Sequence, residues 1–596
     1  MAKTILKFIG GLNKDRIGAN CQVIEHTNDK GEVCRIMIDD GSLFVPYGTE
    51  FSAAYPNVEK YFDRTDLETQ NNLSAPEPVD ALFITHTHQD HIGALIACVR
   101  MGYRLPPIYT SEYTGHVIRL SFSREGVKIP EIRRVKEYNE IKLKDVEVTP
   151  FYVGHSAVDS MGFTVRTFSN DKPYARVIDY GDFLTLEQMP FGHGFDKNKH
   201  LEDLRKKPAP FTLAELDSTS TSKTKRKRIG FEKAVENTYC VCQENADRSI
   251  IVSPVLSGSW NNVAIDLEVA KRLGTKVFFD GQGLKTPKDA LKLSGYDKYD
   301  DVMYHGSVHG YLADKNIKRK YIICTGAFVQ GLDEYMNNVS QTPFSPIYMS
   351  SLTRMALGMH PDFQVSSDYL FITRQRDVES IIGDLGMQAR HLLAAQGAKI
   401  VTTPCGKSQT HFEEVMMQDP NHIDPQSLRE LLEDIDAVVD HLTVLPIHGT
   451  TEQRQATQDI AQVMDICSYM SYNGDHFEIS PQGLKKIEKN EEDEANTFFA
   501  LKKVFKGMDG REDIPFEGIS EYWLIDENYR GIEKLCEVSN VVQTGPKSHS
   551  SGKHIDVEAL ENLPQGEKIS PYTHKPSLRK VKKAGKKRTF PQKQRD

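Results

Sequence analysis

His86-Thr87-His88-Gln89-Asp90-His91 follows directly on the apolar run 79–85, and residues 92–97 then read as the start of a helix. Three imidazoles and a carboxylate within six residues would be costly to bury without a partner. A divalent cation removes that cost, because imidazole and carboxylate ligands suit Zn²⁺, Mn²⁺ and similar ions. In extended chain His86 and His88 point to the same side, whereas Asp90 and His91 lie one turn later. The hexapeptide therefore predicts ligands for two metal ions.

Further ligand candidates stand at the ends of later strand patterns. His155 could complete the shell of the first ion, Asp182 is the natural bridging carboxylate, and His448 could close the shell of the second ion. Taken singly, His155 or His448 could equally be a hydrogen-bonded loop histidine. Asp39 ends an apolar run at Asp39-Asp40-Gly41, and we expect it to orient a ligand rather than to bind metal itself.

The order of strand and helix patterns predicts a layered α/β fold whose site lies at the strand ends. At 596 residues the chain is too long for one core, so we expect several domains. Strand and helix patterns with their own glycine-containing ends continue from about 217 to 376. A helical stretch at 378–396 and a strand at 442–447 follow, and the last 50 residues are rich in Ser, Gly, Pro and Lys.

Composition places the chain among ordinary globular proteins, with 39% hydrophobic and 26% charged residues. No stretch approaches the roughly 18 uninterrupted apolar residues of a membrane span, and the N-terminus lacks the pattern of a signal peptide. Nine cysteines at irregular spacing argue against a disulfide framework and fit a reducing compartment. We therefore expect a cytoplasmic protein without a membrane anchor.

Positive charge is concentrated in two segments, although the net charge is −9. Residues 571–596 hold ten Lys or Arg and one acidic residue, and a second basic run occupies 223–228. Such clusters are typical of a polyanion partner, and the alternative is a solvated segment that aids solubility.

Taken together, these motifs resemble the ribonuclease J family, the β-CASP branch of the metallo-β-lactamase superfamily. The resemblance runs in order over roughly residues 5–480. Its more specific motifs are His155-Ser156-Ala157-Val158-Asp159-Ser160-Met161-Gly162 and Asp217-Ser218-Thr219. It implies a metallo-β-lactamase αββα sandwich at 1–216 and 377–455, an inserted β-CASP α/β domain at 217–376, and a C-terminal extension at 456–596 with a basic tail.

The resemblance also implies an activity, a set of cofactors and partners. Single-stranded RNA would be cut, as an endonuclease, a 5′-to-3′ exonuclease or both, by a hydroxide activated by two divalent ions. Zn²⁺ is the favoured ion, with Mn²⁺ or Mg²⁺ as alternatives. Catalytic roles fall to Asp90 and Asp217, and a 5′-monophosphate pocket would involve Ser156, Asp159 and Ser160. Family members also associate as homodimers or larger homo-oligomers.

The sequence departs from the family at one motif. Where the family strand ends in Gly-His-Ala, with a histidine at the scissile phosphate, the matched segment here reads Cys405-Gly406-Lys407-Ser408. Lys407 would then replace the histidine, bind phosphate and pair with Asp217, and Ser408 would help to bind substrate. Two alternatives follow: a DNA-directed β-CASP nuclease, and a weakly active RNA-binding or scaffold subunit. A small-molecule hydrolase fits less well, since it would not need the large insertion.

Overall fold

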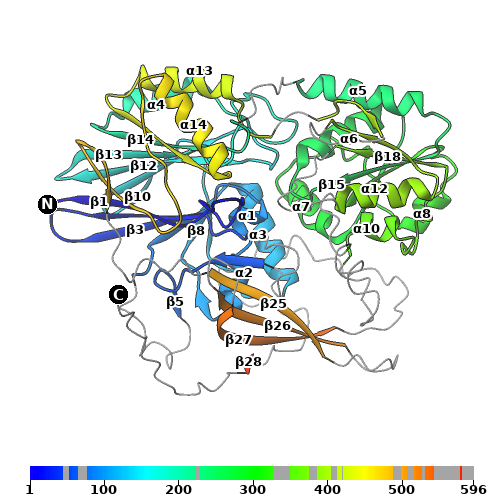
Figure 1. The fold of residues 1–596 in the computed structure, drawn as a ribbon, viewed down its shortest axis with the longest axis horizontal. Helices are drawn as coiled ribbons and strands as arrows, with labels where there is room; N and C mark the ends of the chain where they lie inside the picture. Colours follow the sequence, from blue (N-terminus) through cyan, green and yellow to red (C-terminus); the bar gives the residue numbers. More distant parts are fainter. Residues whose placement is uncertain are drawn as a thin grey trace, which may run out of the picture.

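The computed structural model describes residues 1–43, 53–64, 77–222, 229–326, 332, 349–374, 385–404, 412–418, 421–487, 498–506, 516–525, 531–542 and 578–579. Two large sheets lie face to face in the described part of the chain, and helices cover their outer sides (Figure 1). A separate parallel sheet with its own helices lies beside them, and a smaller antiparallel sheet is formed near the C-terminus.

The first sheet of the sandwich combines the N-terminal strands with two strands from much later in the chain. Strand β1 pairs antiparallel with both β2 and β23, and β2 pairs antiparallel with β3, whereas β3, β6, β8 and β9 run parallel to one another. Its order is β24 (Gly483–Ile487), β23 (His476–Ser480), β1 (Lys3–Gly10), β2 (Cys21–Thr27), β3 (Val33–Ile38), β6 (Ala81–Phe83), β8 (Ile108–Thr110) and β9 (Ile132–Arg134).

The second sheet begins antiparallel and becomes parallel where it reaches the site. Strands β13, β14 and β21 are parallel neighbours, so their carboxyl ends meet at one edge. Its order is β10 (Ile141–Leu143), β11 (Val146–Tyr152), β12 (Met161–Ser169), β13 (Lys172–Asp179), β14 (Thr212–Asp217), β21 (Leu442–Ile447) and β22 (Cys467–Ser468).

Apolar side chains between the sheets and beneath the helices hold the layers together. Leu6, Phe8 and Ile36 of the first sheet pack against Phe163 and Val177 of the second, because alternate residues of each strand point inward. The outer faces pack against α1 (Gln89–Ile92), α2 (Leu95–Arg100), α3 (Glu112–Arg124), α4 (Lys197–Lys206), α13 (Pro425–Asp436) and α14 (Thr451–Val463). The expected αββα sandwich is confirmed.

The third sheet is parallel throughout its described strands, as expected for strands that alternate with covering helices. Its order is β16 (Val277–Asp280), β17 (Lys320–Thr325), β15 (Ile250–Val255), β18 (Tyr369–Thr373), β19 (Lys399–Thr402) and β20 (Glu413–Glu414). Its helices are α5 (Phe231–Glu244), α6 (Trp260–Arg272), α7 (Gln282–Leu293), α8 (Val308–Ala313), α10 (Ser351–Ala356) and α12 (Leu385–Ala395). We call this sheet with its helices the inserted unit.

Two expected domain limits do not coincide with the limits of the sheets. Strands β19 and β20 belong to the inserted sheet although they follow residue 376, and β23 and β24 belong to the sandwich although they follow residue 455. We therefore propose an insertion that runs to about residue 418 and a sandwich that ends at about residue 487.

The remaining strands form smaller sheets. β4 (Ala53–Pro56) pairs with β25 (Phe498–Lys506), which continues into β26 (Phe516–Ile525), β27 (Gly531–Val542) and β28 (Leu578–Arg579). β5 (Asp63–Arg64) pairs with β7 (Tyr103–Arg104). Within the described ranges, no helix combines the length and the apolar character needed to cross a membrane.

Candidate metal centre

The predicted ligands converge because they follow the carboxyl ends of neighbouring strands. Asp39 follows β3, the histidine hexapeptide follows β6, Asp182 follows β13, and His448 follows β21. These strands belong to the two facing sheets, so residues far apart in the sequence meet at one edge of the sandwich. This is the edge where α/β folds place their sites.

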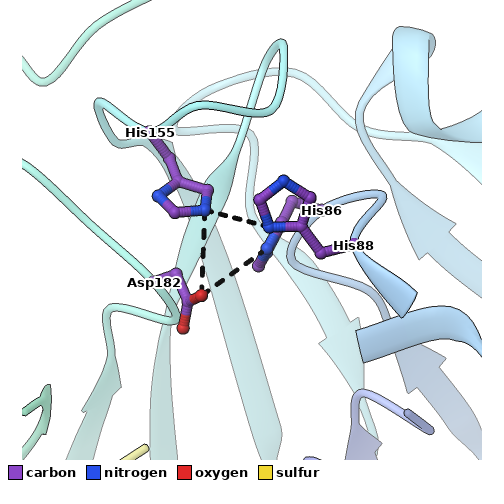
Figure 2. A group of neighbouring side chains, drawn as sticks. All are labelled: His86, His88, His155 and Asp182. Carbon is purple, nitrogen blue, oxygen red and sulfur yellow. Dashed lines mark hydrogen bonds and ion pairs between the residues drawn. The ribbon is translucent and has the colours of Figure 1, made fainter. Parts of the chain in front are cut away.

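The first ligand group consists of His86, His88, His155 and Asp182 (Figure 2). One ligand atom from each lies within 4.8 Å of the others. His155 Nε2 stands 3.2 Å from His88 Nδ1 and 3.7 Å from Asp182 Oδ2. His86 Nε2 is buried and has no hydrogen-bond partner, an arrangement that is costly unless a cation binds it. This group therefore fits a divalent ion.

The second ligand group consists of Asp90, His91, Asp182 and His448. His91 Nε2 lies 3.4 Å from Asp182 Oδ1, and His448 Nε2 lies 3.1 Å from Asp90 Oδ2. Asp182 belongs to both groups and presents Oδ2 to the first and Oδ1 to the second. Its two carboxylate oxygens thus face different ligand groups, and its expected bridging role stays a prediction.

In the centre, neighbouring carboxylates and imidazoles shift one another's pKa values. Burial alone would raise the pKa of Asp182, but the neighbouring His448 and His91 outweigh it and lower that pKa to about 2. Burial alone would lower the pKa of His448, but Asp182, Asp217 and Asp90 raise it to about 10. Burial and neighbouring imidazoles hold the pKa of His86 well below its usual value. The carboxylates thus stabilise positive charge at this point.

Backbone and side-chain groups behind the ligands fix the orientation of the rings. Asp39 Oδ2 lies 2.6 Å from His91 Nδ1, and Asp39 itself accepts hydrogen bonds from the backbone and hydroxyl of Thr85. Asn421 O stands 2.8 Å from His155 Nδ1. Asp39 belongs to neither ligand group, in keeping with its expected orienting role.

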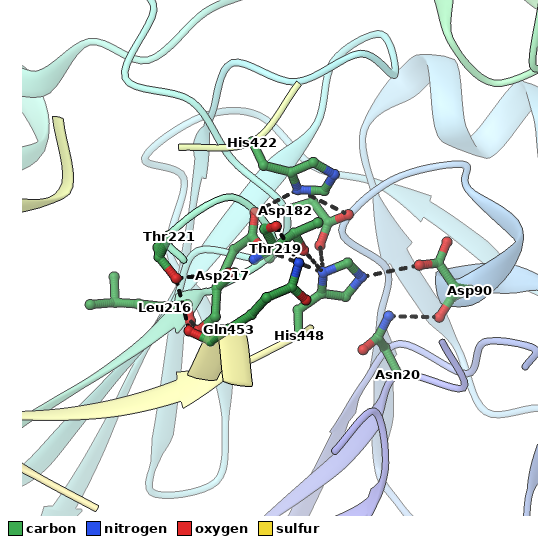
Figure 3. Close-up of polar contacts among 12 residues, drawn as sticks. Asn20, Asp90, Asp182, Leu216, Asp217, Thr219, Thr221, His422, His448 and Gln453 are labelled. Atoms are coloured by element: carbon green, nitrogen blue, oxygen red, sulfur yellow. Dashed lines mark hydrogen bonds and ion pairs between the residues drawn. The ribbon is translucent and has the colours of Figure 1, made fainter. Parts of the chain in front are cut away.

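A histidine that sequence reasoning missed completes the site. His422 Nδ1 lies 2.7 Å from Asp217 Oδ2 and 3.9 Å from Asp182 Oδ2 (Figure 3). Burial alone would lower the pKa of His422, but the Asp217 carboxylate raises it. His422 stands just before α13, whose N-terminus is capped by Asp424 and begins with Pro425. That capping signal, with β21 and His448 beyond it, could have marked His422 as lying at the same edge.

The predicted substrate residues have different surroundings. Ser156 Oγ lies 3.4 Å from His88 Nε2, beside the first group. Ser160 donates its hydroxyl to Ala157 O, and Asp159 accepts hydrogen bonds from His193 and Tyr296. Phosphate binding by these residues stays a prediction.

Other expected features lie outside the described residues. These are Lys407, Ser408, the basic run 223–228 and, apart from β28, the basic tail. Among the described residues, His422 is the histidine that pairs with Asp217, and the role expected of Lys407 stays a prediction.

Comparisons with known proteins agree with this geometry. Residues 58–181 match the β-lactamase superfamily domain. Ribonuclease J2 of Bacillus subtilis is 22% identical over 50% of this chain and 48% of its own length, and ribonuclease J 2 of Staphylococcus saprophyticus is 25% identical over 62% and 61%. Ribonuclease J of Mycolicibacterium smegmatis is 23% identical over 76% of this chain and 70% of its own.

The chain is thus similar to the ribonuclease J family, and its residues 58–181 match the β-lactamase superfamily domain. Its matches span about half to three fifths of the length of the first two relatives. The superfamily implies divalent metals, and the two ligand groups, with the orphaned His86 Nε2 and Asp182 Oδ1, fit them.

Proposed function

We propose that the protein is a metal-dependent ribonuclease that hydrolyses phosphodiester bonds of single-stranded RNA, with Zn²⁺ as the resident ion. The observation that carries this proposal is the position of Asp182. Its carboxylate belongs to both ligand groups and also to a third cluster with Asp217, His422 and His448, in which Asp217 and His422 are paired. When bound, two divalent ions supply Lewis acidity that activates water and neutralises charge on the scissile phosphate.

The residues of the chain provide the remaining chemistry. Asp217 accepts a hydrogen bond from His422 Nδ1, which leaves Nε2 as the atom that can donate a proton. About 20% of the His422 side chain is exposed, so a substrate can reach it. A histidine held by a buried carboxylate is a suitable general acid for the leaving oxygen. We propose this role for His422 in place of Lys407.

RNA is proposed as the polymer because the relatives are named ribonuclease J. The alternative of a weakly active scaffold rests on Lys407, whereas His422 beside Asp217 supports an active site that holds its own histidine. Cytoplasmic location and assembly into homodimers or larger oligomers remain proposals of the family resemblance.

The test is digestion of matched single-stranded RNA and DNA by the Zn²⁺- or Mn²⁺-loaded protein. The RNA is supplied with a 5′-monophosphate, with a 5′-triphosphate and as a circle. We expect RNA to be degraded faster than DNA. Mononucleotides from the 5′-monophosphate form indicate exonuclease action, and cut circles indicate endonuclease action. Faster digestion of DNA would contradict the proposed substrate, and an inert loaded protein would contradict the activity.

A further inference from the structure

The loop between β11 and β12 carries both a metal ligand and an unusual backbone position. His155 belongs to the first ligand group, and Asp159 follows four residues later with a φ of 52°. Positive φ is uncommon for a residue other than glycine and persists where surrounding contacts hold it. Asp159 is buried, with 3% of its surface exposed, so its contacts decide how this loop is placed.

The Asp159 carboxylate is bound from two sides. Oδ1 accepts from the backbone N–H of His193 at 3.0 Å and lies 2.8 Å from His193 Nδ1. Oδ2 accepts from the Tyr296 hydroxyl at 2.7 Å. Tyr296 follows α7 and belongs to the inserted unit, whereas His193 belongs to the sandwich. One carboxylate therefore joins the two parts of the molecule.

The beginning of α6 binds the same loop at its other end. The Trp260 backbone N–H donates to Ser156 O at 2.9 Å, and Asn261 Nδ2 donates to His155 O at 3.3 Å. The Trp260 ring packs edge-on against Phe191 of the sandwich with centroids 5.8 Å apart. The inserted unit thus contacts the loop at the carbonyl of His155 itself.

Three hydrogen bonds from the inserted unit consequently reach the loop. Among the described contacts, the sheet and helices of the inserted unit make no equivalent link to Asp90, His91 or His448 of the second ligand group. Thr219, whose hydroxyl lies 2.6 Å from His448 Nδ1, stands in the segment between β14 and α5. We propose that Asp159 is a positioning residue: Tyr296 acts through it to place His155, so docking of the inserted unit sets the metal affinity of the first group alone. This inference rests on the metal centre of the proposed function, and not on the choice of RNA as substrate.

The test is stepwise Zn²⁺ titration of the metal-free, full-length protein against a chromophoric chelator. Tyr296→Phe removes only the hydroxyl that donates a hydrogen bond to Asp159 Oδ2. We expect the affinity for one of two ions to fall roughly tenfold, in the range seen when a group that orients a ligand is lost. The affinity for the other ion should match that of the wild type. Tyr239→Phe is the matched control, because among the described contacts the Tyr239 hydroxyl accepts a hydrogen bond only from Gln243 within α5.

A second variant, His193→Ala, reaches the same carboxylate from the sandwich side and should weaken the same ion. Circular dichroism of the metal-free proteins checks folding. Equal loss at both ions, or unchanged affinities in both folded variants, overturns the inference. Should Tyr296→Phe fail to fold, the result for His193→Ala decides. Wild-type protein that binds no ion would instead contradict the metal centre of the proposed function, so the two failures are distinguishable.

Discussion

His422 lies beside Asp217 although 205 residues separate them in sequence. The family resemblance assigns this contact to Lys407, because Cys405-Gly406-Lys407 is matched to the family's Gly-His-Ala motif. The contact depends on where the segment before α13 returns to the sandwich, and spacing along the chain does not specify that. The hexapeptide was more predictable, since its four ligands lie within six residues.

His422→Ala should lower kcat on RNA by about 10²- to 10⁴-fold, the range for loss of a general acid, while both ions stay bound. Steady-state kinetics with metal analysis of the purified variant checks it. Lys407→His should give no comparable gain, because the site already holds a histidine. Unchanged turnover in His422→Ala, or loss of an ion from it, would contradict the assigned role.

The elements around the centre impose steric limits of their own. Gly258 stands just before α6, and a Cβ built on it would lie 2.5 Å from His88 Cδ2. Gly258→Ala should therefore displace the His88 ring or the start of α6 and weaken the first group. We expect a lower affinity for one ion by Zn²⁺ titration, with Gly283→Ala as a milder control, since its nearest contact is 3.3 Å. If Gly258→Ala bound both ions with the affinity of the wild type, the predicted steric effect on the first group would be contradicted.

Two neighbouring strands carry a buried pair of acids behind the site. Asp179 of β13 and Glu215 of β14 are register partners, and Gln22 donates to both at 2.7 and 2.9 Å. Burial and then Asp39 raise the pKa of Asp179 to about 7, and burial and then Asp179 raise that of Glu215 well above its usual value. The folded protein therefore retains protons here that the unfolded chain releases.

This difference sets the sign of a pH effect. A group whose pKa is raised on folding adds stability at low pH, and that stability is lost as the pH rises through the folded pKa. Between about pH 5 and 8 the free energy of unfolding of the wild type should fall. That of Glu215→Gln should fall less, and the difference between the two losses should be on the order of 1–3 kcal/mol at pH 8. Denaturant unfolding of both proteins in chelator across this range measures it. Parallel pH profiles would contradict the assigned protonation.

At the scale of the whole molecule, the αββα sandwich could be predicted because its strand ends carry the site motifs in order. The limits of the inserted unit could not be predicted from the sequence. Strands β19 and β23 are both short, and only long-range pairing assigns the first to the inserted sheet and the second to the sandwich. Such pairing depends on which sheet edge is available after folding, which local sequence does not encode.

The central claim is that the two ligand groups hold the ions that support cleavage of RNA. The most direct measurement is cleavage of a labelled single-stranded RNA by protein that has been stripped with chelator and then resupplied with Zn²⁺ or Mn²⁺, beside His88→Ala and Asp90→Ala. The account predicts activity that is lost on chelation, restored by the ion in the wild type and absent from both variants. RNA cleavage retained by both variants would contradict it.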